Sequence, residues 1–422
     1  MDKRIEALIN DTRARFGLDG YFLKRHQLYR RVNLFHETIY SLSMEWFPNH
    51  EVNHDGDYNP EGTASIEMEI DSKKYSSVIF VEGKTFANGV SFQDYSTDDI
   101  IKWVEQETGL QYHKQFLIHK EDEGNLQFSE CIDGIPLSSG YITVQFDEQA
   151  RLTMFTSNIV APTEEVIERE EYTLTIEQME DLVMKQLKLI HYPSFEQEKL
   201  IPVYGIEEIF IRNDVSSTIP FELNMDANSY LPVEETMYWE EPIHGKSMER
   251  RELNWEEVIN PEDAFHQVPS PDSKPITEEQ VKKSIHLIRD FLSVEYKNDS
   301  GMWVVKTLHR DKGYIHAILR MNKDSGTIFQ RKLLIIIDPD DFTVVNYLDN
   351  EAMLGMFAHF EKTVGKILTR ELAYKKLKAY LQLDPRYVFD ANQRKFVLCG
   401  KLDCQYAVHA ISGEIDSLST IR

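Results

Sequence analysis

The chain has 422 residues, of which 41% are hydrophobic, and its 46 Lys and Arg residues against 71 Asp and Glu residues give a formal net charge of −25. This length predicts about two to four domains with enough apolar residues for a sizeable core. The negative charge argues against nucleic acids and anionic membrane surfaces as partners, because like charges repel.

The start of the chain predicts a charged helix and no secretion signal. Asp2, Lys3 and Arg4 follow the first methionine, and Glu6 and Asp11 interrupt the apolar residues that come next. A signal peptide needs a continuous apolar stretch instead, and no apolar run in the chain approaches the roughly 20 residues of a membrane span. We therefore expect a cytoplasmic protein without a membrane span.

The three cysteines are expected to be buried structural thiols. Cys131, Cys399 and Cys404 are few for a chain of this size, and few cysteines without a secretion signal indicate reduced thiols. Cys399 and Cys404 fall in one predicted hairpin, where a disulfide or half of a metal site is the alternative. The sequence offers no further ligands to complete such a metal site, so we expect no metal and no cofactor.

Residues 1–96 are predicted to begin with a helical segment. Apolar residues recur at helical spacing in 4–16 and 20–33, and this part of the chain is also its one basic region. A solvated helical face is the simpler interpretation of the basic residues, and a docking surface for the acidic remainder of the chain or for an acidic partner is the alternative. Strands are predicted at 38–47, 64–70 and 75–82.

The loop after the first of these strands begins like a calcium-binding loop. It reads DGDYN at 55–59, but Pro60 stands where the sharp turn needs Gly, and Ile66 stands where a bidentate Glu is needed. We therefore expect no calcium site there.

Residues 97–160 contain the unit on which the predicted fold is based. Thr97 caps a helix whose apolar residues recur about every 3.6 residues, and Gly109 ends that helix. Strands of alternating apolar and polar residues follow at 126–131, 141–146 and 151–159, joined by turns at 133–134 and 147–150. One helix across an antiparallel meander would bury one helix face against one sheet face.

The same order of elements recurs along the chain. Further helices are predicted from Thr175, from Thr277 with a capping box, and over 358–381, where a break into two helices at 369–373 is the alternative, and strands follow each of them. The predicted fold class is therefore α+β, with repeated helix-plus-antiparallel-meander modules behind an N-terminal helical segment. The predicted segments are 1–96, 97–160, 161–230, 231–276, 277–349 and 350–422.

The segment 231–276 is predicted to be an acidic connector rich in Glu and Pro. Its sequence has little regular periodicity, which is typical of a boundary between modules. Trp239, Trp255 and Phe265 nevertheless predict that it packs on a domain.

No motif with a defined catalytic mechanism occurs in the sequence. The H-E-x-x-H, G-x-S-x-G, P-loop and G-x-G-x-x-G patterns are all missing. His113 and His119 are near each other in sequence, but exposed or hydrogen-bonded histidines are more common than metal ligands. The acidic residues 338–341 lie between two predicted strands, where a turn is the simpler interpretation and a metal or acid–base site the alternative. We therefore assign no catalytic, cofactor-binding or metal-binding residue.

Two stretches resemble PepSY and thermolysin-propeptide modules. In the first, Gly134, Ile135 and Pro136 match the module pattern, Leu137 replaces Val, Asp147 matches, and Ala150 replaces the usual turn Gly. In the second, the matching residues include Tyr406, Gly413 and Glu414, while His409 stands where Asp is usual. The resemblance implies PepSY- or cystatin-like modules, and it marks these residues as structural turn and module positions.

The chain as a whole resembles the YcdB/YcdC-type repeated-domain proteins of Bacillus-like bacteria. The resemblance extends over most of the chain and includes TIYSLSMEWFP at 38–48 and SVIFVEGKTFANG at 77–89. Modules of the PepSY type are associated with inhibiting or chaperoning peptidases, mostly outside the membrane. The family supplies no catalytic residues, and the missing secretion signal departs from many relatives.

The first functional hypothesis is a non-catalytic protein-binding or regulatory protein of unknown process, with a peptidase as a candidate target. Its protein partner would add a strand to an open sheet edge or dock beside a sheet. The alternative is a hydrolase or metal-dependent enzyme with a site assembled from non-sequential residues. That site would gather two or more of His309, His316, Asp338 and Asp340. The oligomeric state is not specified by the sequence.

Overall fold

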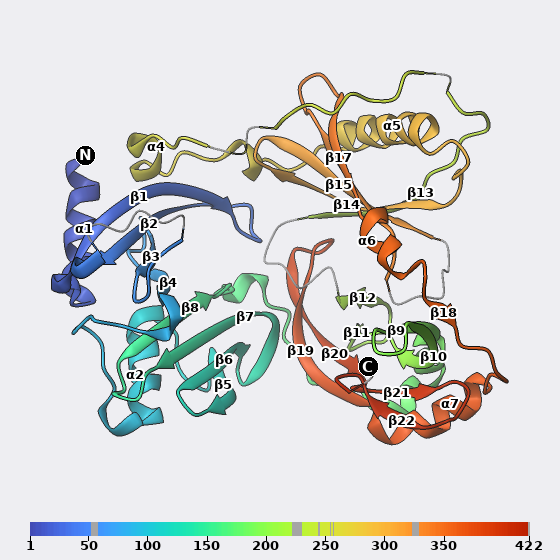
Figure 1. The fold of residues 1–422 in the computed structure, drawn as a ribbon, viewed down its shortest axis with the longest axis horizontal. Helices are drawn as coiled ribbons and strands as arrows, with labels where there is room; N and C mark the ends of the chain where they lie inside the picture. Colours follow the sequence, from blue (N-terminus) through green and yellow to red (C-terminus); the bar gives the residue numbers. More distant parts are fainter. Residues whose placement is uncertain are drawn as a thin grey trace. The chain divides into compact units, whose positions relative to one another are not determined.

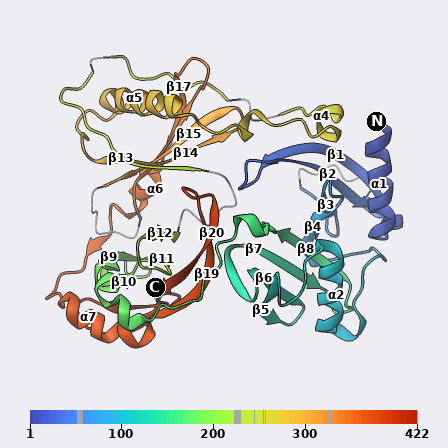
Figure 2. The ribbon, with the colours of Figure 1, turned by 180° about the vertical axis from the view of Figure 1, so that it is seen from behind.

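The computed structural model describes residues 1–51, 58–221, 230–243, 245–253, 255, 257–322 and 329–420 (Figures 1 and 2). The described part of the chain is mostly β, with 40% of its residues in strands and 24% in helices, 3-10 helices included. It forms two compact units. Of the described residues, unit 1 contains 1–167 and 257–273, and unit 2 contains the rest.

Unit 1 is built on an antiparallel sheet with the strand order β1-β2-β3-β4-β8-β7-β6-β5. Two helices, α1 (Lys3–Arg15) and α2 (Thr97–Thr108), contribute Ile5, Leu8, Ile100 and Val104 to its core. Gly109 ends α2 in the left-handed conformation. The strands are β1 (Tyr21–Val32), β2 (Thr38–Pro48), β3 (Ala64–Glu69), β4 (Tyr75–Phe80), β5 (Phe116–Asp122), β6 (Asn125–Ile132), β7 (Ile135–Phe146) and β8 (Leu152–Asn158).

The segment 257–273 belongs to unit 1 although it is far away in sequence. Its helix α4 (Pro261–Phe265) is capped by Asn260 and places Ala264, which is 0% exposed, in the core of unit 1. The Tyr40 hydroxyl donates to the carbonyl of Val268 at 2.7 Å, and the Ser270 N–H donates to the Thr38 hydroxyl at 2.8 Å. These contacts tie the chain back onto strand β2 after it has passed through unit 2.

The basic residues near the N-terminus are paired within unit 1. Five arginines on α1 and β1 form ion pairs with carboxylates, namely Arg4–Glu262, Arg15–Glu107, Arg25–Glu45, Arg30–Glu257 and Arg31–Glu69. Two of these carboxylates lie in the segment 257–273. The basic region therefore docks an acidic segment of the same chain.

Unit 2 contains a five-stranded antiparallel sheet covered on one face by the long helix α5 (Figure 1). The helix starts at the capping box of Thr277 and Gln280 and buries Ile288 and Leu292 against Trp303 and Leu319. The elements in sequence order are β13 (Leu231–Thr236), α5 (Glu278–Glu295), β14 (Trp303–Asp311), β15 (Tyr314–Met321), β16 (Lys332–Ile337) and β17 (Val344–Asp349).

The remaining strands of unit 2 come from two distant stretches that interleave. β10 pairs with β21, and β11 pairs with β20, while the short helices α3 and α7 share one core with them. The elements are α3 (Glu180–Gln186), β9 (Leu187–Ser194), β10 (Lys199–Ile206), β11 (Ile209–Arg212), β12 (Thr218–Pro220), α6 (Glu351–Leu354), β18 (Glu361–Lys362), α7 (Arg370–Leu377), β19 (Gln382–Asp390), β20 (Lys395–Asp403), β21 (Tyr406–His409) and β22 (Ile415–Ser417).

The predicted fold class, α+β with repeated helix-plus-antiparallel-meander modules, is wrong. The chain is dominated by strands, and the segments 161–230 and 350–422 do not fold as separate meanders, because β10 and β11 each pair with a strand of the other segment. Strand pairing between distant segments cannot be read from local periodicity. The six predicted segment boundaries stay predictions.

The N-terminal helical segment is also wrong in its second half. Residues 21–32 form strand β1, which pairs with β2 along its whole length. The spacing of Tyr21, Leu28 and Val32 fits a helix, but pairing with β2 satisfies the backbone of β1 and overrides local preference. Likewise, 358–381 is not one helix: α7 begins after the Thr369 cap, within the stretch 369–373 that the sequence offers as a break.

Placing an acidic side chain at position 264 is expected to destabilise unit 1. Ala264→Asp would bury a carboxylate without a partner in the core, and we expect a loss of about 2–3 kcal/mol in the free energy of unfolding. Chemical denaturation followed by fluorescence, with hydrogen exchange of β2, measures the effect. Val258→Asp is the matched control, because Val258 is 97% exposed. Equal stabilities of the two variants would contradict the assignment of this segment to unit 1.

Candidate functional site

The residues that carry the PepSY resemblance in unit 1 lie in two hairpin turns. Asp133 and Gly134 have φ of 47° and 85°, and Ile135 opens strand β7 opposite Ile132. Two consecutive positive φ angles suit a tight hairpin, which explains the Asp-Gly pair. In the next turn, Asp147 accepts hydrogen bonds from the N–H groups of Gln149 and Arg151, both at 2.9 Å.

The corresponding residues of unit 2 surround the β21–β22 turn. Tyr406 begins β21, and its ring lies 4.5 Å from that of Tyr380. The Gly413 N–H donates to the carbonyl of His409 at 2.8 Å, and the Glu414 carbonyl accepts from the His409 N–H at 2.8 Å. These contacts close turns, and none of them places a nucleophile beside a base.

The four residues of the enzyme alternative do not form a metal centre. His309 and His316 face each other across β14 and β15 with ring centroids 5.2 Å apart, and burial lowers the pKa of His316 to about 4, so it is neutral at pH 7. Asp338 instead accepts the N–H of Asp340 at 2.9 Å within the β16–β17 turn. In the described part of the chain, no three His, Cys, Asp or Glu residues could hold a metal.

The cysteines do not supply a reactive thiolate. Cys131, Cys399 and Cys404 are free and buried. Burial raises the pKa of all three thiols, that of Cys399 to about 12. A thiol must ionise to act as a nucleophile, so these side chains are core residues. The calcium-like stretch at 55–57 lies outside the described residues.

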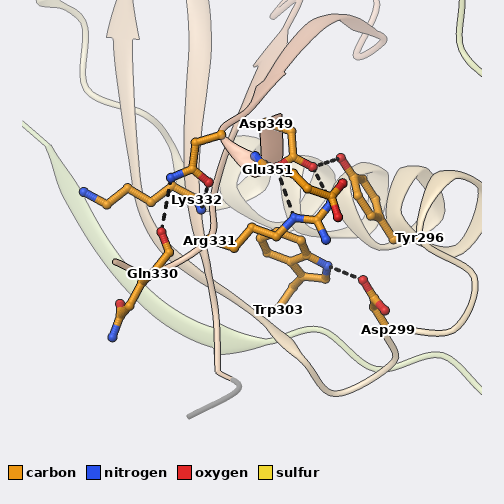
Figure 3. Close-up of polar contacts among 9 residues, drawn as sticks. Tyr296, Asp299, Trp303, Gln330, Arg331, Lys332, Asp349 and Glu351 are labelled. Atoms are coloured by element: carbon orange, nitrogen blue, oxygen red, sulfur yellow. Dashed lines mark hydrogen bonds and ion pairs between the residues drawn. The ribbon is translucent and has the colours of Figure 1, made fainter. Parts of the chain in front are cut away.

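A polar cluster at one end of the β16–β17 hairpin centres on Arg331 (Figure 3). The Arg331 guanidinium donates to both oxygens of Asp349, at 3.1 and 2.6 Å, and to Glu351 at 2.6 Å. The Tyr296 hydroxyl, from the C-terminal end of α5, donates to Asp349 at 2.8 Å. The guanidinium also lies over the rings of Tyr296 and Trp303, 5.5 and 5.6 Å from their centroids. We call these five residues the Arg331 clamp.

The electrostatics of the Arg331 clamp favour the ionised pair. Burial alone would raise the pKa of Asp349, but the bonds from Arg331 and Tyr296 outweigh it and hold that pKa below its ordinary value. The hydrogen bond to Asp349 likewise raises the pKa of Arg331. Burial, followed by the bond to Asp349, raises the pKa of Tyr296. Near neutral pH, Asp349 and Arg331 therefore stay charged and Tyr296 stays neutral, which suits a structural clamp better than proton transfer.

The Arg331 clamp fixes the segment that follows β17. The Asp349 carboxylate accepts the N–H of Glu351 at 2.9 Å at the start of α6. Asn350 accepts the N–H of Lys332 at 2.8 Å and donates to the carbonyl of Gln330 at 3.1 Å (Figure 3). Both chain segments that leave this end of the hairpin are thus bound to each other by side chains.

An exposed apolar surface lies on these two segments and on the β9–β10 turn. Phe195, Phe329, Met353 and Met356 are 64%, 44%, 71% and 54% exposed. The half-buried Phe357 joins them, since its ring centroid is 5.7 Å from that of Phe195 and 5.1 Å from that of Phe329. We call these five residues the Phe/Met surface.

The Phe/Met surface is the best candidate for a binding site in the described part of the chain. Phe and Met are enriched at protein interfaces, and a cluster of exposed apolar side chains on a monomer often marks a binding site. Methionine side chains are flexible and polarisable, so they adapt to a partner's surface. The sequence interpretation missed this site, because Phe195 and Phe329 are isolated in the sequence and meet Phe357 only in the fold. The stretch EAMLGMF at 351–357 is the one local feature of the sequence that indicates an apolar surface.

Comparisons with known proteins do not identify a family. No family model and no curated protein matches the sequence. A search of solved structures matches the chain to one described as "Bacillus megaterium YpeB C-terminal domain", at 8% sequence identity and a TM-score of 0.26, covering 82% of this chain and 96% of the other. A TM-score this low does not establish a shared fold. In the described ranges, no helix is both long and apolar enough to cross a membrane.

Removing the central cation of the clamp is expected to destabilise unit 2. Arg331→Met would leave Asp349, whose side chain is 13% exposed, without its cation, and we expect a loss of about 2–3 kcal/mol in the free energy of unfolding. Lys84→Met is the control. It breaks an ion pair with Glu61 in which the Lys84 and Glu61 side chains are 53% and 45% exposed, and it should change the free energy of unfolding by less than about 0.5 kcal/mol. Denaturant titration of both variants checks the difference, and similar losses would argue against the clamp.

The Arg331 clamp should also make the folding stability of unit 2 sensitive to acid. Because the folded-state pKa of Asp349 is lowered, its contribution to stability is complete above the unfolded value of about 4 and is lost as pH falls through the folded value. Asp349→Asn should therefore be less stable than the natural protein at pH 6, with a smaller difference at pH 2–3. Thermal unfolding at each pH measures this, and a difference that is constant with pH would contradict it.

Proposed function

We propose that the chain is a non-catalytic protein-binding protein that takes part in regulation and holds its partner at the Phe/Met surface. One observation carries the proposal: four large apolar side chains of unit 2 are exposed instead of packing into its core. They are Phe195, Phe329, Met353 and Met356. The Arg331 clamp supports it, because a surface held in one geometry loses less entropy on binding.

Docking on the Phe/Met surface is favoured over strand addition at the neighbouring sheet edges. At one edge, β17 is already occupied, since the Arg251 N–H donates to the carbonyl of Val345 at 2.9 Å. At the other edge, β13 carries Pro232 and an irregularity before Glu235, with Glu234 at a φ of 53°. Proline and bulges at an edge discourage pairing with another chain.

The net charge indicates the chemistry of the partner. A chain with a charge of −25 repels a second copy of itself and attracts basic proteins at long range. Exposed carboxylates at Glu196, Glu198 and Glu361 are close in sequence to residues of the Phe/Met surface. The partner we propose is therefore a protein with a basic surface that presents apolar side chains.

The resemblance to PepSY modules makes a peptidase the first class of partner to test. The finer assignment, to the YcdB/YcdC-type repeated-domain proteins, is a proposal that rests on the sequence resemblance alone. A cytoplasmic location is likewise a proposal, and it rests on the three free thiols.

Polar substitutions at the Phe/Met surface are expected to abolish partner binding without unfolding the chain. The full chain, the double variant Phe329→Ser/Met356→Ser and the control Tyr141→Ser/Val258→Ser are immobilised and exposed to extract from the source cell. The control residues are 52% and 97% exposed and lie in unit 1. We expect a basic protein that the natural chain and the control retain and the surface variant loses, with affinity for the isolated partner at least about tenfold weaker.

Three outcomes would contradict this function. A partner retained equally by the surface variant would place binding elsewhere, and no specific partner across a range of salt concentrations would remove the main support. Light scattering that shows a dimer dissolved by the surface variant would assign the surface to a second copy of the chain. If the partner is a peptidase, its activity with and without the chain shows whether binding inhibits it.

A further inference from the structure

A short loop of unit 2 presents aliphatic side chains to solvent. The loop joins β18 to α7 (Figure 1). Val364 and Ile367 in this loop and Leu372 in the first turn of α7 are 93%, 39% and 47% exposed. The opposite side of α7 buries Tyr374 and Leu377. The three exposed aliphatic residues therefore lie outside the core to which α7 belongs.

The loop is held in place at both of its ends. At its start, the Thr363 N–H donates to the carbonyl of Leu200 at 3.1 Å. At its end, the Leu368 N–H donates to the carbonyl of Ala410 at 2.7 Å, and the Leu368 carbonyl accepts from the Tyr204 hydroxyl at 2.9 Å. The fold of unit 2 therefore sets the outward position of the aliphatic side chains.

Unpaired cations accompany these aliphatic residues. The stretch 361–378 contains six Lys or Arg residues and two Glu residues, in a chain whose net charge is −25. One of the six, Lys378, pairs with Glu180 at 3.4 Å. The other five are exposed and form no ion pair within the described part of the chain; they are Lys362, Lys366, Arg370, Lys375 and Lys376. The five arginines of α1 and β1 differ from them, because carboxylates of unit 1 neutralise those side chains.

The cations and the aliphatic side chains lie close together. Leu372 is followed at spacings of three and four residues by Lys375 and Lys376, so the three share the outward side of α7. A Cβ atom at Gly413 would lie 3.2 Å from the Leu368 side chain and 3.5 Å from that of Lys376, which places this cation next to the end of the loop. We call the three exposed aliphatic residues and the five unpaired cations the basic loop surface.

The composition of the basic loop surface suits an anionic lipid surface better than a protein. Lysine is depleted at protein interfaces. Lysines beside exposed aliphatic side chains are instead typical of segments that lie in the headgroup region of a membrane. The net charge of the chain opposes this contact, but salt screens charges that are more than about 8–10 Å away. The charge of the surface itself therefore decides whether it binds.

We propose that the basic loop surface binds anionic phospholipid membranes, with its cations at the headgroups and Val364 and Ile367 at the boundary with the acyl chains. For this surface alone, the proposal reverses the expectation drawn from the net charge. The Phe/Met surface has neighbouring carboxylates and suits a basic partner, so the two surfaces take ligands of opposite charge. Lipid binding does not depend on the protein partner proposed above.

Co-sedimentation of the full chain with lipid vesicles tests the proposal. One set of vesicles is pure phosphatidylcholine, and in the other about a third of the lipid is phosphatidylglycerol. We expect binding to the anionic vesicles only. Because salt screens the attraction, the affinity should fall at least about tenfold between about 0.05 and 0.5 M salt.

A charge variant and its matched control locate the contact. Lys366→Gln/Lys376→Gln should weaken binding to the anionic vesicles at least about tenfold, because each cation near the headgroups contributes to the affinity. Lys102→Gln/Lys120→Gln removes two charges from unit 1, where the side chains are 68% and 58% exposed. This control changes the net charge by the same amount and should bind the vesicles like the natural chain.

A second measurement follows the aliphatic side chains directly. Val364→Cys introduces a thiol that a polarity-sensitive dye can reach, since the three natural cysteines are buried. The emission of the attached dye should shift to shorter wavelength when anionic vesicles are added. Val258→Cys is the matched control, because Val258 is 97% exposed in unit 1, and its emission should stay unchanged.

Several results would overturn the proposal. Equal binding to both kinds of vesicle, equal losses in the charge variant and its control, or an unchanged emission at position 364 would each do so. An absence of vesicle binding, together with an acidic protein that the natural chain retains and the charge variant loses, would assign the surface to a protein partner. Phe329→Ser/Met356→Ser should bind the vesicles normally, so this proposal and the function proposed above can fail separately.

Discussion

Strand pairing between two distant stretches of the chain is the constraint on which unit 2 depends. β10 and β11 come from one stretch, and they pair with β21 and β20 from the other. Neither stretch can satisfy its own backbone hydrogen bonds alone, and a buried backbone group without a partner is costly. The strands β13–β17 of the five-stranded sheet lie between the two stretches in sequence, so the chain must close long loops before unit 2 is complete. Unit 2 therefore cannot be completed until both stretches are present, which is incompatible with independent repeats.

This pairing also explains which parts of the fold could be predicted. The α2 helix and the β6–β7 and β7–β8 hairpins were foreseen, because caps, Asp-Gly turns and period-two patterns are local. The α5 helix was foreseen from its capping box for the same reason. In contrast, β1 has apolar spacing that suits a helix, and only its register with β2 makes it a strand. Local patterns specify elements, whereas partners that are distant in sequence decide how those elements assemble.

The candidate site was hidden from the sequence for a related reason. Phe195 and Phe357 are far apart in the chain, and neither belongs to a periodic pattern that would mark a shared surface. Arg331 and Asp349 were likewise unremarkable in a chain with 71 acidic residues, where any single carboxylate carries little information. The roles of these residues depend on the β16–β17 hairpin, which brings Arg331 beside Asp349. After the hairpin, the chain continues directly into Met353 and Met356. A candidate site built at a hairpin end can therefore be recognised only once the register of that hairpin is known.

Two buried carboxylates of unit 1 show how the same side chain takes different roles. Glu107 is 8% exposed and faces Arg15, so its charge is neutralised where it is buried. Glu130 is more deeply buried and meets two backbone N–H groups, which donate hydrogen bonds but carry no net charge. Backbone donors lower the cost of a buried charge without removing it, because only an opposite charge offsets the lost hydration at this depth. A carboxyl group that meets only neutral donors at this depth therefore holds its proton more tightly than usual, as the raised pKa of Glu130 shows.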